Sequence, residues 1–316
     1  MSASASGLAD EVAQSGRVRA FLRLVVIEHS VFALPFAYLA ALTAMRTLPQ
    51  QCTPRLRTEL PVQGCGWVRW SDLALITVAM VAARTFAMAA NRVIDRELDA
   101  RNPRTAQREL VTGAVSVRTA QVGAAVALVV FLGAAAALGR LPLLLAPLAV
   151  LPLVVYPYGK RFTDYPQAIL GLAQAVAPVG AWIAVTGHWS WSSVVLGVGV
   201  GLWIGGFDLI YACQDTESDR AQGVRSFPAR WGNVAALRTS SVVHAVTFAL
   251  FLWFGVLEGF GLIWYLGLAA TAGSFLYQHR IVSPTDLSRV NRSFFTSNGF
   301  VGLALGAAGI LDLALR

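Results

Sequence analysis

Two acidic stretches of this chain carry side chains whose spacing suits metal and phosphate chemistry. The first contains Asn91, Asp95 and Asp99 at positions i, i+4 and i+8. Because successive residues of an α-helix turn by about 100°, these side chains fall within about 80° of one helical face. Like charges four residues apart repel each other in a helix, so we expect a cation to bind there.

The second stretch has a similar pattern. Asp208, Tyr211, Asp215 and Asp219 recur at i, i+3, i+7 and i+11 and form one stripe along a helix. Oxygen ligands without histidine or cysteine favour hard ions, and Mg²⁺ usually leaves positions for substrate phosphates. One such stretch alone could be a solvated helix end. Two stretches at the same depth and on the same face of a membrane indicate a site for a diphosphate bridged by Mg²⁺.

Basic side chains accompany both stretches and allow two interpretations. Any of them could anchor a helix at the membrane surface. Guanidinium groups also bind phosphate oxygens bidentately and could neutralise a departing diphosphate. Arg101, Arg104 and Arg108 follow the first stretch, Arg220 and Arg225 follow the second, and Tyr156, Lys160 and Arg161 lie in a loop elsewhere.

Arg84 differs from these residues because it lies inside an apolar segment, seven residues before Asn91 and on the same helical face. A buried arginine needs an anion. One interpretation is an ion pair with one of the aspartates. The other is a receptor for the carboxylate of a second, aromatic substrate.

The composition places these residues in a membrane. The chain has 316 residues, of which 56% are hydrophobic and only 13% charged, more apolar surface than a soluble domain of this size needs. Apolar segments of membrane-spanning length predict an all-α fold, a polytopic bundle of nine transmembrane helices. The segments lie near 22–45, 72–92, 118–138, 141–157, 166–186, 192–213, 238–256, 260–279 and 293–315.

The distribution of basic residues predicts the orientation of this bundle. Of the 25 Lys and Arg residues, 18 fall on the side of the two acidic stretches and 6 on the other, with Arg84 inside a helix. The positive-inside rule makes the richer side cytoplasmic, so the N-terminus lies inside and the C-terminus outside. We expect a multi-pass protein of the plasma (inner) membrane with its site toward the cytoplasm. The same asymmetry explains the net charge of +8 without nucleic acid.

The short loops leave room for one domain. We expect a cytoplasmic tail over residues 1–21, without the apolar core of a cleavable signal, and one membrane-embedded domain over 22–316. Cys52 and Cys65 fall in a loop expected outside, where a disulfide is chemically feasible. Cys213 has no histidine or cysteine at metal-ligand spacing in the sequence, so we interpret it as a residue that only packs in the bundle. Nothing in the sequence indicates an obligate protein partner.

These motifs resemble the UbiA superfamily of intramembrane aromatic prenyltransferases over nearly the whole chain. NRVIDRELDARNPRT is similar to the family's first Asp-rich motif and YACQDTESDRAQGVRSFPARWG to its second. YPYGKRFT resembles the loop between helices four and five, and EHSVFALPFAY resembles the first helix of the quinone-biosynthesis branch. Val111, where a proline is usual, and the additional acid Glu217 depart from the pattern without removing a ligand.

The resemblance implies a lateral opening to lipid and a polyprenyl diphosphate bound through Mg²⁺. By motif position, Asn91, Asp95, Asp99, Asp215 and Asp219 would hold the metal and the diphosphate. Arg104, Tyr156 and Lys160 would contact the diphosphate or the allylic cation, and Arg84 would bind the carboxylate of the acceptor. The implied reaction is ionisation of the allylic diphosphate followed by attack of an electron-rich ring.

Two alternatives remain open at this level. The leading candidate acceptors are 4-hydroxybenzoate and a dihydroxynaphthoate of menaquinone synthesis. The acceptors of the haem, chlorophyll and lipid-ether branches of the family are the other candidates. An ion-coupled transporter also uses paired acids in half-repeats, although its site usually lies near the bilayer midplane. Release of diphosphate during turnover distinguishes an enzyme from a carrier.

Overall fold

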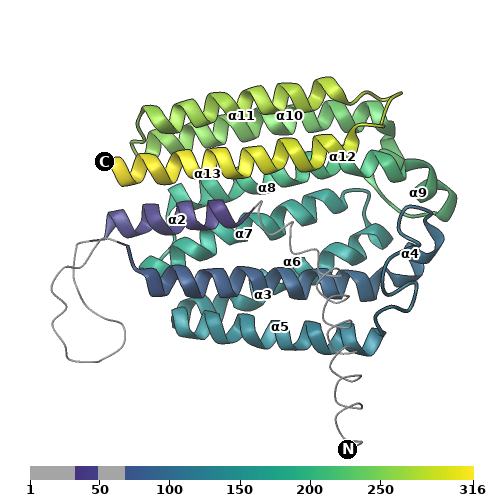
Figure 1. Cartoon of the computed structure of the whole chain (residues 1–316), viewed down its shortest axis with the longest axis horizontal. Helices are drawn as coiled ribbons and strands as arrows, with labels where there is room; N and C mark the ends of the chain where they lie inside the picture. The colour runs from purple at the N-terminus through teal and green to yellow at the C-terminus, as the bar shows by residue number, and fades with distance from the viewer. Residues whose placement is uncertain (1–32, 49–67) are drawn as a thin grey trace, which may run out of the picture.

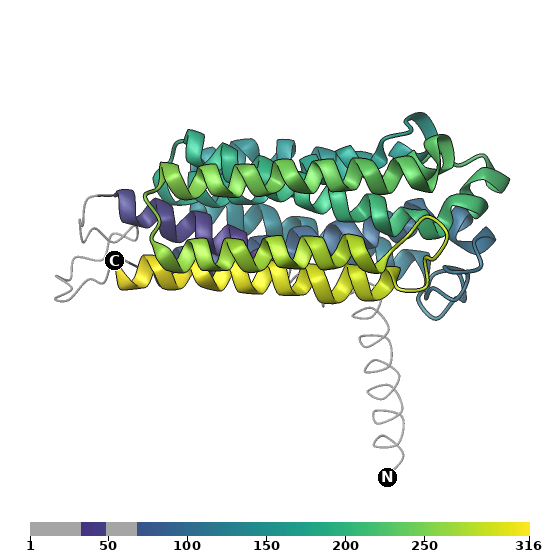
Figure 2. The ribbon, with the colours of Figure 1, turned by 90° about the horizontal axis from the view of Figure 1, so that it is seen from above.

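The computed structural model describes residues 33–48 and 68–316, and every regular element in these ranges is helical. The elements in chain order are α2 (Leu34–Thr47), α3 (Trp70–Ile94), α4 (Arg96–Arg101), α5 (Val117–Leu138), α6 (Arg140–Phe162), α7 (Pro166–Thr186), α8 (Trp191–Ala212), η2 (Cys213–Asp215), α9 (Thr216–Gln222), α10 (Phe227–Leu257), α11 (Leu262–Ile281), α12 (Val290–Arg292), the π-helical turn η3 (Ser293–Ser297) and α13 (Asn298–Leu315). The long helices lie side by side in one bundle, and successive ones run in opposite directions (Figures 1 and 2).

Seven stretches of the described chain are long and apolar enough to cross a membrane. They are Trp70–Ile94, Val117–Leu138, Arg140–Phe162, Pro166–Thr186, Trp191–Gln222, Phe227–Leu257 and Val290–Leu315. The chain is therefore an integral membrane protein. Helices α2 and α11 also match expected segments but are not among the seven, and the expected first segment begins outside the described residues. The count of nine spans and the orientation of the termini stay predictions.

Local signals explain where two neighbouring helices begin and end. Ser116 caps α5 by accepting a hydrogen bond from the Thr119 backbone N–H at 3.0 Å, a common N-terminal signal. Gly139 alone separates α5 from α6, with a φ of 142° that glycine adopts without steric cost. The two expected segments are thus distinct helices.

Helix α10 begins earlier than its apolar segment predicts. The expected range was 238–256, whereas the helix spans Phe227–Leu257. Ser226 caps its first turn by accepting a hydrogen bond from the Ala229 N–H at 3.3 Å, and Gly232 interrupts it with a φ of 82°. Apolar length alone misses this polar first part of the helix.

Helices α7 and α8 approach each other through glycines. A Cβ at Gly201 of α8 would lie 2.5 Å from the carbonyl oxygen of Gly171 of α7, and a Cβ at Gly197 would lie 2.5 Å from the Ala175 oxygen. Small residues allow such close backbone contact, which drives helix association where lipid supplies no hydrophobic force. Because α7 and α8 both line the cavity described below, this contact fixes part of its wall.

Aromatic side chains join α2, α8 and α10 in the core. Phe36 stacks on Phe251 and meets Trp203 edge-on, each at 5.4 Å between ring centroids. All three side chains are fully buried. Offset and edge-to-face contacts of this kind add to the burial of apolar surface.

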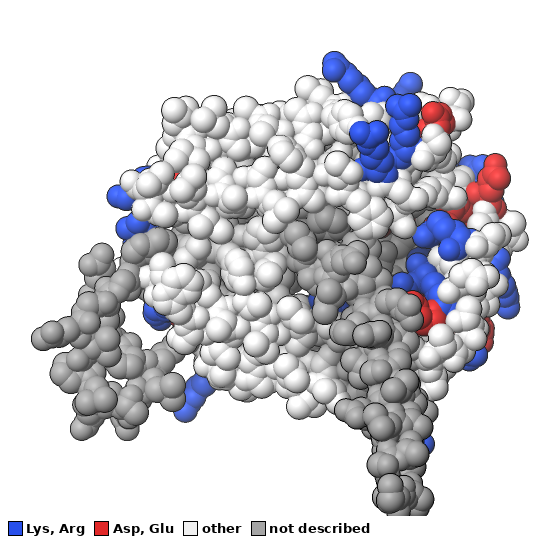
Figure 3. All heavy atoms as spheres, viewed as in Figure 1, with Lys and Arg blue, Asp and Glu red and all other residues white. Residues whose placement is uncertain are grey.

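Charged side chains gather at one end of the bundle (Figure 3). The connections at this end carry α4, α9 and the segment between α11 and α12 (Figure 1). Both acidic stretches reach this end, one at the end of α3 and the other at the end of α8. The fold therefore brings the two motifs to the same level of the bundle, as the sequence predicts.

Candidate active site

A cavity of about 430 Å³ lies among α3, α5, α6, α7 and α8 and is polar at one end. Most of its remaining lining is apolar and follows the helices toward the opposite end of the bundle. The polar end is formed by Asn91, Asp99, Asn102, Arg104, Arg108, Lys160, Tyr211, Asp215 and Asp219. Apolar walls come from residues such as Ala79, Met80, Phe131, Leu145, Ala149, Ala177 and Ile204.

Asp95 caps α3 at the point where the helix turns into α4, and its side chain is fully buried. Its carboxylate accepts hydrogen bonds from Lys160 Nζ at 2.9 Å and from Arg161 Nη1 at 3.4 Å. Arg161 also donates to the Ile94 carbonyl oxygen at 2.8 Å. Asp95 does not line the cavity. In this state it joins α3 to the end of α6 and holds Lys160 at the polar end.

Asp99 lies on α4 and faces the cavity. Both of its carboxylate oxygens accept hydrogen bonds from Arg108 Nη1, at 2.6 and 2.7 Å. Thr105 donates its hydroxyl to the Asp99 carbonyl oxygen at 3.0 Å, which ties the following loop to the helix. The first acidic motif and the arginine that follows it therefore form one local unit.

Asp215 lies at the end of η2 and binds the loop that follows the first motif. Arg104 donates to it through Nε at 2.9 Å and Nη2 at 2.5 Å, and Asn102 Nδ2 donates at 2.9 Å. The Arg104 guanidinium also donates to the Tyr211 hydroxyl at 3.2 Å and lies over its ring. Burial acts to lower the pKa of Arg104, but its hydrogen bond to Asp215 and that residue's charge raise the pKa above its usual value.

Asp219 and Arg225 have different surroundings. Asp219 lies on α9, lines the cavity and accepts a hydrogen bond from Ser226 Oγ at 2.7 Å. Arg225 instead donates its backbone N–H to the Lys160 carbonyl oxygen at 2.9 Å and its guanidinium to the Phe162 oxygen at 2.7 Å. Arg225 does not line the cavity. It fastens the second motif to the end of α6.

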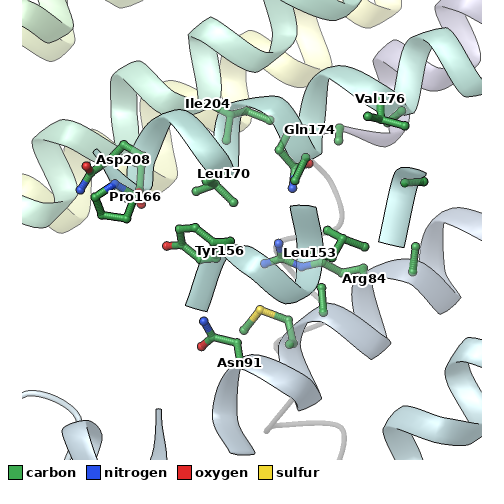
Figure 4. A pocket seen from close by; sticks show the side chains of 18 of the residues that line it. Arg84, Asn91, Leu153, Tyr156, Pro166, Leu170, Gln174, Val176, Ile204 and Asp208 are labelled. Atoms are coloured by element: carbon green, nitrogen blue, oxygen red, sulfur yellow. The ribbon is translucent and has the colours of Figure 1, made fainter. Parts of the chain in front are cut away.

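The deeper part of the cavity holds a second group of polar side chains. Arg84 from α3, Tyr156 from α6, Gln174 from α7 and Asp208 from α8 face the same space (Figure 4). Arg84 forms no ion pair with an aspartate of the described chain, and its buried Nε has no hydrogen-bond partner there. The ion-pair interpretation of Arg84 therefore finds no support among the described residues.

The side chains at the polar end suit a magnesium ion in their chemistry, although the described part of the chain holds no preformed cluster. Within 33–48 and 68–316, no group of three or more His, Cys, Asp or Glu side chains lies close enough to hold a metal ion. Four of the five expected ligands nevertheless line one cavity: Asn91, Asp99, Asp215 and Asp219. Mg²⁺ commonly binds one or two carboxylates plus substrate phosphates, so this oxygen donor set fits the ion together with a diphosphate.

Several residues at the site do not belong to the acidic and basic patterns of the sequence. Asn102, Gln167, Gln174 and Phe294 line the cavity, and Ser226 holds Asp219. The Asn102-Pro103 dipeptide is a loop signal that could have drawn attention to Asn102. The glutamines of α7 lie in an apolar segment, where uncharged polar residues give little warning. Cys213 is buried, with its thiol 3.4 Å from the Leu209 carbonyl oxygen, and Cys52 and Cys65 lie outside the described residues.

The fold and this site define an intramembrane enzyme with an anion-binding end and an apolar chamber between helices. The sequence model of the UbiA prenyltransferase family matches residues 62–299. The chain belongs to this family and is a prenyltransferase.

Relatives and solved structures agree with this assignment. The 4-hydroxybenzoate octaprenyltransferase of Nitrosospira multiformis is 32% identical over 79% of this chain and 86% of its own length. The enzyme of the same name from Nitrosococcus oceani is 33% identical over 75% and 83%. The apo structure of a UbiA homologue from Aeropyrum pernix superposes with a TM-score of 0.76, at 33% identity over 90% of this chain and 98% of the other.

A second solved structure shares the fold at lower identity. It is a UbiA homologue from Archaeoglobus fulgidus bound to DMAPP and Mg²⁺, with a TM-score of 0.67 and 19% identity over 94% of this chain and 99% of the other.

Proposed function

We propose that this protein transfers a polyprenyl group from a polyprenyl diphosphate to a carboxylated aromatic precursor of ubiquinone or menaquinone, with Mg²⁺ as cofactor. The observation that carries this proposal is the cavity, which combines acidic and basic side chains at one end, Arg84 deeper in without an ion-pair partner among residues 33–48 and 68–316, and an otherwise apolar lining. These three regions complement a diphosphate, a carboxylate and a prenyl chain.

The comparisons support the donor and the acceptor separately. The relatives carry the name 4-hydroxybenzoate octaprenyltransferase, which favours a long prenyl donor and a benzoate acceptor. The Archaeoglobus fulgidus homologue was solved with DMAPP and Mg²⁺, which supports a magnesium-bound diphosphate on this fold. The sequence motifs keep a dihydroxynaphthoate as a second candidate acceptor.

The polar end supplies both the ligands and the cations that such a headgroup needs. Asn91, Asp95, Asp99, Asp215 and Asp219 would hold Mg²⁺, which supplies positive charge for the departing diphosphate when bound. Arg104, Arg108 and Lys160 are bound to carboxylates of the two motifs in this structure. When the headgroup binds, these three cations exchange a carboxylate for a phosphate oxygen and stabilise the leaving group.

The remaining residues orient the substrates and exclude water. Tyr156 faces the cavity between the polar end and Arg84 (Figure 4), where its ring can stabilise an allylic cation. Arg84 binds the carboxylate of the acceptor and directs its ring toward the prenyl carbon that bears the diphosphate. The apolar walls protect the cation, because water would otherwise capture it.

The location of the site relative to the membrane is part of the same proposal. Most charged side chains gather at the end that holds both motifs (Figure 3). The positive-inside rule assigns this end to the cytoplasm. We therefore place the protein in the plasma (inner) membrane, with the headgroup site open to the cytoplasmic side and the prenyl chain in the bilayer.

The proposal is tested by prenyl transfer in detergent-purified protein. A polyprenyl diphosphate is supplied with 4-hydroxybenzoate or a dihydroxynaphthoate, with and without Mg²⁺, and both prenylated product and released diphosphate are measured. We expect Mg²⁺-dependent product with one of these acceptors and no product from Asp215→Ala. Glu217→Gln is the matched control, because Glu217 is an exposed acid of the same motif and its loss should leave activity unchanged.

Other outcomes redirect the assignment. Diphosphate release and product formation only with an acceptor that lacks a carboxylate would move the protein to the haem, chlorophyll or lipid-ether branch and remove the proposed role of Arg84. Full activity after chelation of Mg²⁺ would contradict the role of both acidic motifs.

A further inference from the structure

Among the described residues, Asp208 is an acid of this cavity whose carboxylate has no hydrogen-bond or ion-pair partner. Asp95, Asp99 and Asp215 each bind a basic side chain, and Asp219 binds Ser226. Across residues 33–48 and 68–316, no hydrogen bond or ion pair reaches the carboxylate of Asp208, although the residue lines the cavity. A carboxylate kept free in a mostly apolar chamber is costly, which indicates that the site uses it.

The position of Asp208 lies between the two binding regions of the cavity. It precedes Asp215 by seven residues and therefore lies about 10 Å deeper along the helix. Arg84 precedes Asn91 by the same number of residues on α3, so the carboxylate site is also about 10 Å from the headgroup site. In Figure 4, Asp208 and the hydroxyl of Tyr156 lie toward the same side of the cavity, while Arg84 and Gln174 lie farther along it. An aromatic ring held at Arg84 extends toward Asp208.

We propose that Asp208 is the general base that removes the ring proton from the acceptor. This inference rests on the proposed prenyl transfer and assigns one step of it. The ring carbon forms a bond to the first carbon of the prenyl group, the carbon–oxygen bond to the diphosphate breaks, and the diphosphate leaves with that electron pair. The ring proton then passes to an Asp208 carboxylate oxygen, its C–H electron pair restores aromaticity, and the proton is later released to solvent.

The neighbouring groups are unsuited to this step. Lys160 is a cation bound to Asp95 and has no free electron pair for a proton. The phenol of Tyr156 already carries its proton at neutral pH. Asp215 is held by Arg104 at the headgroup, away from the deeper ring.

The proposal predicts that loss of the base uncouples ionisation of the donor from product formation. Without Asp208 the ring adduct keeps its proton and returns to the allylic cation, which water captures as a prenyl alcohol. The experiment compares wild type, Asp208→Asn and Asp208→Glu with geranyl diphosphate, Mg²⁺ and whichever of 4-hydroxybenzoate or dihydroxynaphthoate the wild type prenylates. The amounts of prenylated product, released diphosphate and prenyl alcohol are each measured in the same reaction, once with ordinary and once with ring-deuterated acceptor.

We expect wild type to form one product per diphosphate, with no isotope effect. Asp208→Asn should form product about 100-fold more slowly, release diphosphate with prenyl alcohol, and show a primary isotope effect. Asp208→Glu should recover part of the product per diphosphate. This ratio does not depend on the folded fraction, and Asp286→Asn, an exposed acid outside the cavity, is the control. If Asp208→Asn does not fold, Asp208→Glu still tests the proposal. Its product per released diphosphate must be lower than that of wild type, because the longer side chain displaces the carboxylate.

Two results overturn the assignment. In the first, Asp208→Asn loses diphosphate release and product equally, which indicates a binding role. In the second, the variant forms product near the wild-type rate without an isotope effect. A wild type that neither ionises the donor nor forms product contradicts the proposed function instead, so the two failures are distinguishable.

Discussion

Arg104 and Asp215 form a two-point ion pair, with Nε to Oδ1 at 2.9 Å and Nη2 to Oδ2 at 2.5 Å. Arg104 belongs to the loop that follows the first acidic motif, and Asp215 belongs to the second. The pair therefore joins two segments 111 residues apart in sequence at the mouth of the cavity. Asn102 strengthens the contact by donating to the same carboxylate. The two motifs form one site rather than two independent helix ends.

Replacing Arg104 should weaken both the donor complex and its ionisation. We expect Arg104→Ala to lower kcat/KM for the prenyl diphosphate by about 10²- to 10³-fold, because a donor aimed at developing negative charge is lost. Arg104→Lys keeps the positive charge but lacks the planar guanidinium, so its kcat/KM should lie between those of wild type and Arg104→Ala. The measurement is steady-state diphosphate release at saturating acceptor.

The control for this prediction is Arg101→Ala. Arg101 is exposed on α4 and forms no ion pair within the described chain. Its loss should change kcat/KM by no more than about twofold, as for most surface substitutions. Equal losses from the two arginines would show that general positive charge, rather than the contact with Asp215, matters at this end.

Replacing Arg84 should affect the acceptor and spare the donor. Arg84→Met keeps an apolar chain of similar length but removes the guanidinium. We expect KM for the carboxylated acceptor to rise about 10- to 100-fold, the loss of one charge-assisted hydrogen-bonding group. The dissociation constant of the prenyl diphosphate should stay within about twofold, because Arg84 lies roughly 10 Å deeper than Asn91. Steady-state kinetics with varied acceptor measure the first change, and a binding titration of the prenyl diphosphate alone measures the second.

A decarboxylated acceptor supplies the second arm of the test. Phenol, used in place of 4-hydroxybenzoate, should bind wild type poorly. Arg84→Met should weaken phenol binding only slightly further, because phenol lacks the carboxylate that Arg84 is proposed to bind. An equal loss with both acceptors would make Arg84 a structural residue.

The sequence predicts the helical fold well because membrane segments are limited by bilayer thickness. The apolar segments 118–138 and 141–157 predict two separate helices, and α5 and α6 confirm this, with Gly139 between them at a φ of 142°. The start of α10 was missed by 11 residues, since a capped and partly polar first part has no apolar signal. Hydropathy identifies the buried length of a helix, whereas capping residues such as Ser226 decide where it begins.

The candidate site was predictable in its residue types but not in its pairings. Asn91, Asp99, Asp215 and Asp219 line one cavity, which the repeated acidic spacing suggested. Which cation pairs with which acid depends on how the loops fold over the helix ends. The ion pairs are Arg104 with Asp215, Arg108 with Asp99 and Lys160 with Asp95. Sequence spacing holds no information on such contacts across the bundle.

Asp95 should contribute to stability even without metal. Its fully buried carboxylate binds Lys160 and Arg161 and joins α3 to α6. Asp95→Ala removes this anion, but the side chains of Lys160 and Arg161 are 32% and 40% exposed and can regain water. We therefore expect a loss of about 1–3 kcal/mol, below the value for a fully buried pair. Thermal unfolding in detergent with EDTA measures this loss apart from any metal effect.

Asp219→Ala is the comparison for this prediction. Asp219 also belongs to the acidic motifs, but within the described chain its carboxylate accepts a hydrogen bond from the Ser226 hydroxyl alone. The loss of a neutral donor costs about 1 kcal/mol. Asp219→Ala should thus lower the Tm of the metal-free protein less than Asp95→Ala does. If the two variants have the same Tm as wild type without Mg²⁺, the bonds of Asp95 to α6 do not stabilise the fold.

The contact between α7 and α8 gives a stability prediction with a matched control. A Cβ at Gly201 would lie 2.5 Å from the Gly171 carbonyl oxygen, and both atoms belong to backbone that cannot rotate away. Gly201→Ala must therefore separate the helices, at a cost of about 1–3 kcal/mol for overpacking. Gly180 is also helical but has nothing within 4 Å of its Cβ position, so Gly180→Ala should be neutral or stabilise by up to about 1 kcal/mol. Opposite shifts of Tm in the two variants would establish that backbone contact at Gly201, rather than glycine content, sets the spacing of α7 and α8 and with it the wall of the cavity. Equal shifts would contradict it.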